Sequence, residues 1–201
     1  MKKYLIILMI SLMAACAKED DFDLGKTMHK RPDTNRTIFD FVGLMQDVEE
    51  SASRYLENIR NRYQIEVLIV ALPSLNQQYT VNQAAAEMFS NWKIGKDYQG
   101  RGILLLLVDD VKEVKLEVGF ELEDVFTDMF TGYIEDLQLQ PRYSAGELEI
   151  GLIAVMEELE ARSQVKFKGG YTRADIADMD VRHLSQGAGA RRALDDYQPQ
   201  A

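Results

Sequence analysis

Apolar residues form two short runs, one unbroken and one interrupted only by Glu66, and one alternating stretch along the chain. The runs occupy residues 65–71 and 103–108 and have the length of a strand, which predicts two strands buried on both faces. Apolar and charged residues alternate from 114 to 118, so a third strand with one buried face is expected there. The connection between the last two strands is far too short for a parallel crossover. We therefore expect these strands to be antiparallel neighbours.

Apolar residues at spacings of three and four predict helices between and after these strands. The helical stripes occupy residues 44–59, 81–92, 122–137 and 144–159. Trp92 is in phase with Phe89 and is expected to be a core anchor, Pro141 is expected to end the third helix, and Ser144 and Glu147 stand at the spacing of a capping box. The alternation of helices and strands predicts an α/β fold, an α/β/α sandwich with a mixed central sheet flanked by helices.

The first fifteen residues have the features of a secretory signal peptide. Two lysines precede an apolar stretch, which ends in the small residues Ala14 and Ala15. Cys16 follows directly, and this arrangement resembles the bacterial lipobox, in which the cysteine becomes the lipidated N-terminus. The alternative is an ordinary signal peptide with a chance cysteine. Cys16 is the only cysteine, so no intrachain disulfide is possible. We expect a lipid-anchored, extracytoplasmic protein of the bacterial cell envelope.

Polar and charged composition marks the segments on either side of the helix and strand pattern. Residues 16–37 are predicted to be a flexible tether, in which His29 is solvated. The folded domain is expected over residues 38–162. Residues 163–201 are predicted to be a flexible tail in which only residues 175–184 could form a short helix.

The formal net charge of the chain is −10. Removal of the signal peptide takes away Lys2 and Lys3 and leaves −12. An acidic surface disfavours nucleic acid and anionic lipid headgroups as partners, and it tolerates divalent cations.

A glycine corner after the last predicted strand carries the candidate chemistry. Glu117, Glu123 and Asp128 surround Gly119, and Asp40 could lie at the same end of the sheet. Calcium binds six to eight oxygen ligands from carboxylates and carbonyls, so these four acids are a candidate metal site. The alternative is a solvated acidic start of a helix. No histidine lies in residues 38–162, which removes the commonest general base.

Several motifs in order resemble the TPM domain family over residues 38–162. The matching elements are DFVGL at 40–44, WKIG at 92–95, GILLL at 102–106, EVGFELE at 117–123 with Asp128, and PRY at 141–143. The resemblance implies an α/β sandwich outside the bacterial membrane or in the thylakoid lumen. It also implies divalent-metal binding by acids near strand ends and a link to the maintenance of membrane protein complexes. An acid phosphatase activity is reported for some members.

Three of the candidate residues take family positions by this resemblance. Asp40 matches the acid before the first helix, Glu123 the glutamate of the G-x-x-L-E element, and Asp128 the aspartate after it. Glu121 stands where the family usually has a second glycine, and a side chain there restricts the backbone. We therefore expect a membrane-tethered module that binds Ca²⁺ or a similar ion and takes part in interactions or membrane-protein maintenance. The alternatives are a metal-assisted acid phosphatase acting on phosphomonoesters and a structural lipoprotein with no ligand.

Overall fold

The computed structural model describes residues 22–168 and 171–182. The predicted signal peptide, Cys16 and the tether as far as residue 21 lie outside the described residues. The same holds for residues 183–201 of the predicted tail.

Four strands form one mixed sheet in the order β1-β2-β3-β4. They are β1 (Ile38–Asp40), β2 (Glu66–Leu72), β3 (Gly102–Val108) and β4 (Glu113–Val118). β1, β2 and β3 are parallel and β4 is antiparallel to β3, which confirms the predicted antiparallel pair. β1 was not expected, because three residues are too few to show a strand pattern.

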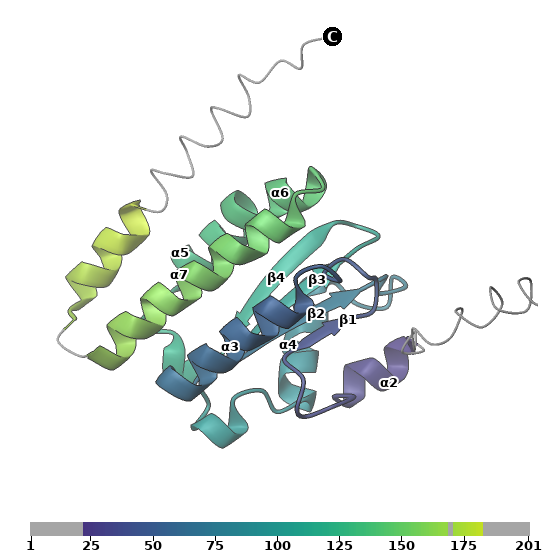
Figure 1. The fold of residues 1–201 in the computed structure, drawn as a ribbon, viewed down its shortest axis with the longest axis horizontal. Helices are drawn as coiled ribbons and strands as arrows, with labels where there is room; N and C mark the ends of the chain where they lie inside the picture. Colours follow the sequence, from purple (N-terminus) through teal and green to yellow (C-terminus); the bar gives the residue numbers. More distant parts are fainter. Residues whose placement is uncertain (1–21, 169–170, 183–201) are drawn as a thin grey trace, which may run out of the picture.

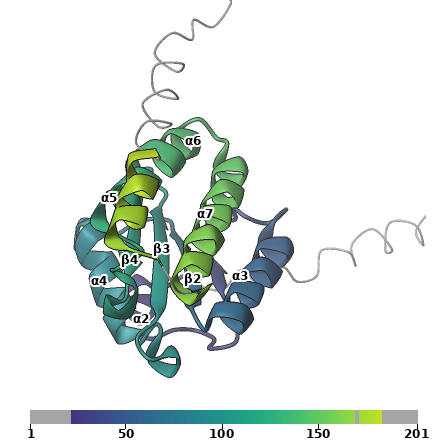
Figure 2. The ribbon, with the colours of Figure 1, turned by 90° about the vertical axis from the view of Figure 1, so that its left-hand side faces the viewer.

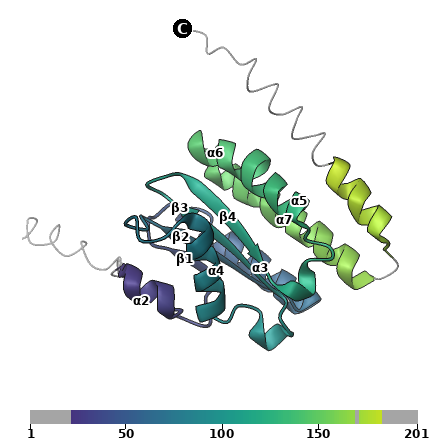
Figure 3. The same ribbon diagram turned by 180° about the vertical axis from the view of Figure 1, so that it is seen from behind.

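Helices cover both faces of the sheet, so the predicted α/β/α sandwich is confirmed (Figure 1). α3 (Glu49–Tyr63) and α7 (Leu148–Lys168) pack on one face, as the turned view in Figure 2 also shows. α2 (Leu24–His29) and α4 (Val81–Asn91) pack on the other face, seen from behind in Figure 3. Short 3₁₀ turns, η1 (Lys96–Tyr98) and η2 (Phe120–Leu122), precede β3 and follow β4.

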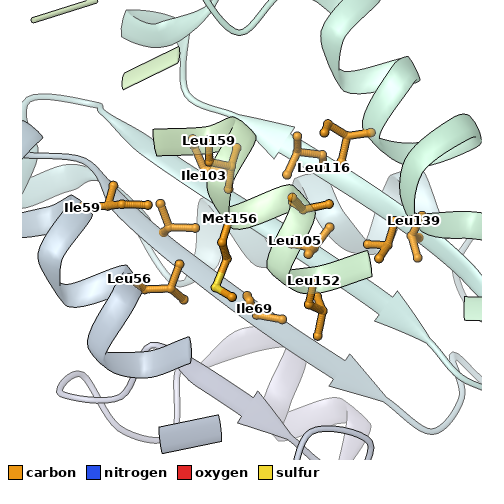
Figure 4. Close-up of a cluster of buried hydrophobic side chains, with 14 of the residues drawn as sticks. Leu56, Ile59, Ile69, Ile103, Leu105, Leu116, Leu139, Leu152, Met156 and Leu159 are labelled. Carbon is orange, nitrogen blue, oxygen red and sulfur yellow. The ribbon is translucent and has the colours of Figure 1, made fainter. Parts of the chain in front are cut away.

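The unbroken apolar run of β3 is explained by burial on both faces. Ile103, Leu105 and Leu107 join the core under α3 and α7, part of which is drawn in Figure 4. Leu104, Leu106 and Val108 alternate with them and join the core under α2 and α4. Every residue of β3 is buried, so this strand is the centre of the fold.

The third predicted helix differs from the observed one in its start and in its end. It begins at α5 (Asp128–Gly132), because the Thr127 hydroxyl caps it by accepting from the Phe130 N–H. It continues through the π-helical segment η3 (Tyr133–Leu139) into α6 (Gln140–Ser144). Pro141 does not end the helix: the π segment shifts the hydrogen bonding by one residue, and the proline, which has no N–H, lies in the first turn of α6.

The predicted capping box of Ser144 and Glu147 is wrong. Ser144 is the last residue of α6, and α7 begins at Leu148 after a turn through Gly146. Gly146 has a φ of +78°, so the chain reverses there with a backbone conformation that suits glycine. α7 then runs to Lys168, beyond the predicted end.

The prediction of a flexible tether is wrong for α2. Leu24 and Met28 lie one helical turn apart and are buried in the same core cluster as the apolar residues of α4. Asp23 caps the helix by accepting from the Lys26 N–H. The indole N–H of Trp92 donates to the carbonyl of Thr27 at 2.7 Å, which confirms Trp92 as a core anchor and explains why α2 is held in place.

The prediction of a flexible tail is wrong for residues 163–168, and the short helix allowed over residues 175–184 is present at residues 173–182. The first segment belongs to α7, and the second is a helix that packs beside it (Figure 1). Ile176 is 4% exposed and joins the core. Asp180 accepts from the buried guanidinium of Arg162 at 2.5 Å, so this helix is attached to the domain by a buried ion pair.

Candidate functional site

Asp40 ends β1 and shapes the loop that follows. Its Oδ1 accepts from the N–H groups of Val42 (3.2 Å) and Gly43 (2.9 Å), and its Oδ2 accepts from the N–H of Met45 (2.7 Å). These three bonds fix the carboxylate at the C-terminal end of the strand. Parallel strands end at the same side of a sheet, and ligands of open α/β sheets bind there.

Two further aspartates follow β3 at that side. Asp109 accepts from the hydroxyl of Tyr143 at 2.9 Å and from the ammonium of Lys112. Asp110 is exposed and accepts from the Ser74 hydroxyl at 2.6 Å. We call Asp40, Asp109, Asp110 and Tyr143 the carboxyl edge. It brings three carboxylates and one phenol together from β1, β3 and α6.

The pKa values of the carboxyl edge show the mutual influence of its groups. Burial raises the pKa of Tyr143, and the hydrogen bond to Asp109 and the charges of Asp109, Asp40 and Asp110 raise it further. The hydrogen bond from Lys112 lowers the pKa of Asp109, and the bond from Tyr143 adds to this, while burial opposes both. The edge therefore concentrates negative charge beside a neutral phenol.

The lowered pKa of Asp109 predicts an effect of acid on stability. The unfolded carboxyl takes up its proton near 3.8, before the folded one, so the contribution of Asp109 is present above that pH and is lost as the pH falls through the lower folded pKa. The Asp109→Asn variant should lose less of its stability than the wild type between about pH 4 and pH 2. Urea denaturation at several pH values measures this, and parallel pH profiles of the two proteins would contradict it.

The other predicted site residues lie towards the opposite end of the strands of the sheet. Glu117 pairs with Leu104 near the start of β3, whereas Asp40 is level with Leu107. Asp40 and Glu117 are offset by three residues along the strand direction and by three strand spacings across the sheet. Their backbone positions are therefore roughly 17 Å apart. Cross-strand partners share a face, so Asp40 belongs to the face of α3 and α7 and Glu117 to the face of α4.

The structure brings only part of the predicted metal set together. Burial raises the pKa of Glu117, with smaller contributions from the charges of Glu135 and Glu123, so Glu117 and Glu123 are electrostatic neighbours. Asp128 is the exposed first residue of α5. Within residues 22–168 and 171–182, no three acidic, histidine or cysteine side chains are placed as ligands of one ion. The proposal of one site from Asp40, Glu117, Glu123 and Asp128 is therefore not supported by their positions.

Comparison with known proteins decides the family. The sequence model of the TPM domain matches residues 38–162, which is more than half of the chain. The chain belongs to the TPM domain family. None of the curated proteins compared with it matches. The TPM domain is also similar to the solution NMR structure of the N-terminal domain of a protein from P. gingivalis, with 24% identity and a TM-score of 0.58 over 75% of this chain and 96% of that one. This likeness supports the fold.

Glycines of the TPM motifs allow the backbone to pack closely where β3 begins. A Cβ atom on Gly119 would lie 2.2 Å from the carbonyl oxygen of Gly100, and one on Gly95 would lie 2.4 Å from the nitrogen of Gly102. Gly95 also has a φ of +79°. Close backbone packing therefore explains why glycine stands at these motif positions. Glu121 does not have a positive φ and is exposed, so its side chain fits this TPM domain without backbone strain.

Sequence reasoning missed Asp109, Asp110 and Tyr143 as site residues. The sequence indicates only that the two aspartates form the turn that ends the buried strand. A signal was present, because acids that directly follow a buried parallel strand point to the ligand side of an α/β sheet. It could not be used for Asp40 and Asp109 together, since β1 was not predicted and the pairing of β1, β2 and β3 was unknown.

Proposed function

We propose that this TPM domain is tethered outside the cytoplasm to the bacterial cell envelope through a lipid at Cys16 and binds a divalent cation, Ca²⁺ most readily, at the carboxyl edge. In this proposal it serves as an interaction module or in membrane-protein maintenance. One observation supports the proposal of cation binding: Asp109 accepts from the hydroxyl of Tyr143, and the charges of Asp40 and Asp110 also act on that hydroxyl. The three carboxylates are not placed as ligands of one ion in the described residues, so a bound cation would have to draw them together.

The donors of the carboxyl edge suit a hard cation. Carboxylate and carbonyl oxygens are the ligands that Ca²⁺ prefers, and its coordination tolerates irregular geometry and water. Asp110 is the most accessible donor because it is exposed and, among the described residues, only the Ser74 hydroxyl donates to it. Asp109 is shared with Lys112, so it would join the cation by giving up that ion pair. Asp40 would act mainly through its charge, since three backbone N–H groups hold its oxygens.

Isothermal titration with Ca²⁺ tests the site with a matched pair of variants. The soluble chain from Ala17 onward should bind Ca²⁺, and Asp110→Asn should weaken binding by about tenfold or more, because it removes one charged ligand. Glu123→Gln removes the same charge at the glycine corner and should leave binding unchanged. Absence of binding in the wild type, or loss of binding in Glu123→Gln alone, would contradict the proposal.

Phosphomonoester hydrolysis remains the alternative that the family resemblance implies. It would use the same carboxylates, so Asp110→Asn should abolish any rate that purified protein shows with p-nitrophenyl phosphate and added metal. A rate that is retained in this variant would assign the hydrolysis elsewhere.

An exposed aromatic residue supports the interaction role. The side chain of Phe120 is 81% exposed at the turn after β4, where a groove of about 510 Å³ separates it from the end of α4. Lys93 and Lys96 line the same groove. Exposed aromatic residues with nearby cations are typical of protein interfaces. Among the described helices, none is long and apolar enough to cross a membrane.

A further inference from the structure

A mostly apolar groove of about 620 Å³ runs along α2. Its lining includes the cationic side chains of Lys26 and Lys30, the imidazole of His29, and the apolar surfaces of Pro32 and Phe41. It therefore combines an apolar floor with a basic rim, which is the arrangement of an amphipathic binding surface.

The groove carries more positive than negative charge on a protein that is acidic as a whole, because Lys26 and Lys30 line it together with one carboxylate, that of Asp23. The chain carries a formal net charge of −10, yet Lys26, His29 and Lys30 lie within five residues and are all exposed. Lys26 pairs with Asp23 at 3.3 Å, and no carboxylate of the described residues forms an ion pair with Lys30. The net charge of the chain disfavours binding to anionic lipids, but the local charge of the groove differs from it in sign.

The core holds the groove in a fixed shape. Met28, on the inner side of α2, is fully buried. The side-chain amide of Asn91 donates to the Met28 carbonyl at 3.1 Å, in addition to the bond from Trp92 to Thr27. α2 is therefore part of the folded domain, and its basic side is presented outward as a preformed surface.

The position of the groove in the chain places it close to the proposed lipid anchor. The described structure begins at Phe22, whose ring packs against that of Phe41 at 5.3 Å between centroids. Only six residue steps separate Cys16 from Phe22, and a fully extended chain covers at most about 22 Å over that length. If Cys16 carries a lipid, the groove must lie within reach of the headgroup layer.

We propose that the α2 groove binds the headgroup of an anionic phospholipid in the membrane that holds the anchor, an inference that rests on the proposed tether. Lys26 and Lys30 contact the phosphate, and Pro32 and Phe41 contact the glycerol and the first methylenes. Basic side chains close to a membrane surface gain from the negative potential of anionic lipids. The tethered domain is thereby oriented with α2 towards the bilayer.

Vesicle flotation tests the groove without help from the anchor. The mature chain, residues 16–201 with Cys16→Ser, is mixed with phosphatidylcholine vesicles that contain 30% phosphatidylglycerol, and with vesicles of phosphatidylcholine alone. It should bind the anionic vesicles, and the Lys26→Glu/Lys30→Glu variant should bind them about tenfold or more weakly. The control Arg54→Glu/Arg173→Glu makes the same change of charge at two exposed helix positions away from α2 and should bind within about twofold of the unchanged chain.

Two outcomes would overturn the groove proposal. These are equal binding of the unchanged chain to both kinds of vesicle, and equal loss of binding in both double variants, which would show a general effect of charge. Circular dichroism checks that each variant is folded. The tether is decided separately by the mass of Cys16 in protein from the membrane fraction: an unmodified cysteine would overturn the tether, and the flotation result would still decide the groove.

Discussion

Replacing Asp180 with alanine should lower the free energy of unfolding by about 3–5 kcal/mol, because it removes the carboxylate that pairs with a buried cation. Arg162 is 0% exposed, and its guanidinium also donates to the carbonyl of Val125 at 2.6 Å and lies 4.0 Å from the ring centre of Phe130. Asp180 is 5% exposed and is held further by the hydroxyl of Thr127 at 2.8 Å. Breaking such a pair costs far more than breaking a surface pair.

Asp178 provides the matched control on the same helix. It forms an ion pair with Arg182 in which both side chains are more than 60% exposed, so Asp178→Ala should change the free energy of unfolding by less than about 1 kcal/mol. Urea denaturation measures both variants. Replacing both partners, Arg162→Met with Asp180→Leu, should restore most of the loss. A loss below about 1 kcal/mol in Asp180→Ala would show that the helix over residues 173–182 contributes little to the folded domain.

Leu105→Ala should lower the free energy of unfolding by a similar amount, about 3–5 kcal/mol, by opening a cavity in the centre of the sheet. Leu105 is 1% exposed in the strand between β2 and β4, and it belongs to the buried cluster with Ile69, Leu116, Leu152 and Met156 shown in Figure 4. Neighbours on two strands and one helix would have to move to fill the space, so the cavity should collapse only in part.

Ile150→Ala is the control for this truncation. Ile150 lies on α7 with its side chain 54% exposed, and its replacement should change stability by less than about 0.5 kcal/mol. Chemical denaturation of both variants gives the comparison. A loss in Leu105→Ala no larger than that of the control would contradict the placement of β3 at the centre of the core.

Hydrophobic pattern was sufficient for the central part of the fold. Residues 103–108 were expected to be buried on both faces, and the structure divides them alternately between the two cores. The hydrophobic pattern was not sufficient to predict short helices that are held in place by tertiary contacts. α2 exposes half of its six residues, and it is held by the burial of Leu24 and Met28 and by a bond from Trp92, which no local pattern reveals. The helix over residues 173–182 likewise depends on Arg162.

The candidate site depended on sheet order, which the sequence did not specify. Asp40 and Glu123 take matching positions in the TPM motifs, yet the strand register places Asp40 and Glu117 at opposite sides and on opposite faces of the sheet. The pairing of β1 with β2 brings Asp40 to the side where β3 ends in Asp109 and Asp110. The sequence predicts a site made of carboxylates, and which carboxylates lie near one another depends on the topology.

Titration of the isotope-labelled TPM domain with Ca²⁺, followed through its backbone amide NMR signals, tests the location of the cation site most directly. The carboxyl edge should respond: the amides of residues 41–45 and 109–112 should shift and saturate together. The amides of residues 117–128 should stay in place. Saturable shifts confined to residues 117–128, or no saturable shift in either segment, would contradict a cation site at the carboxyl edge.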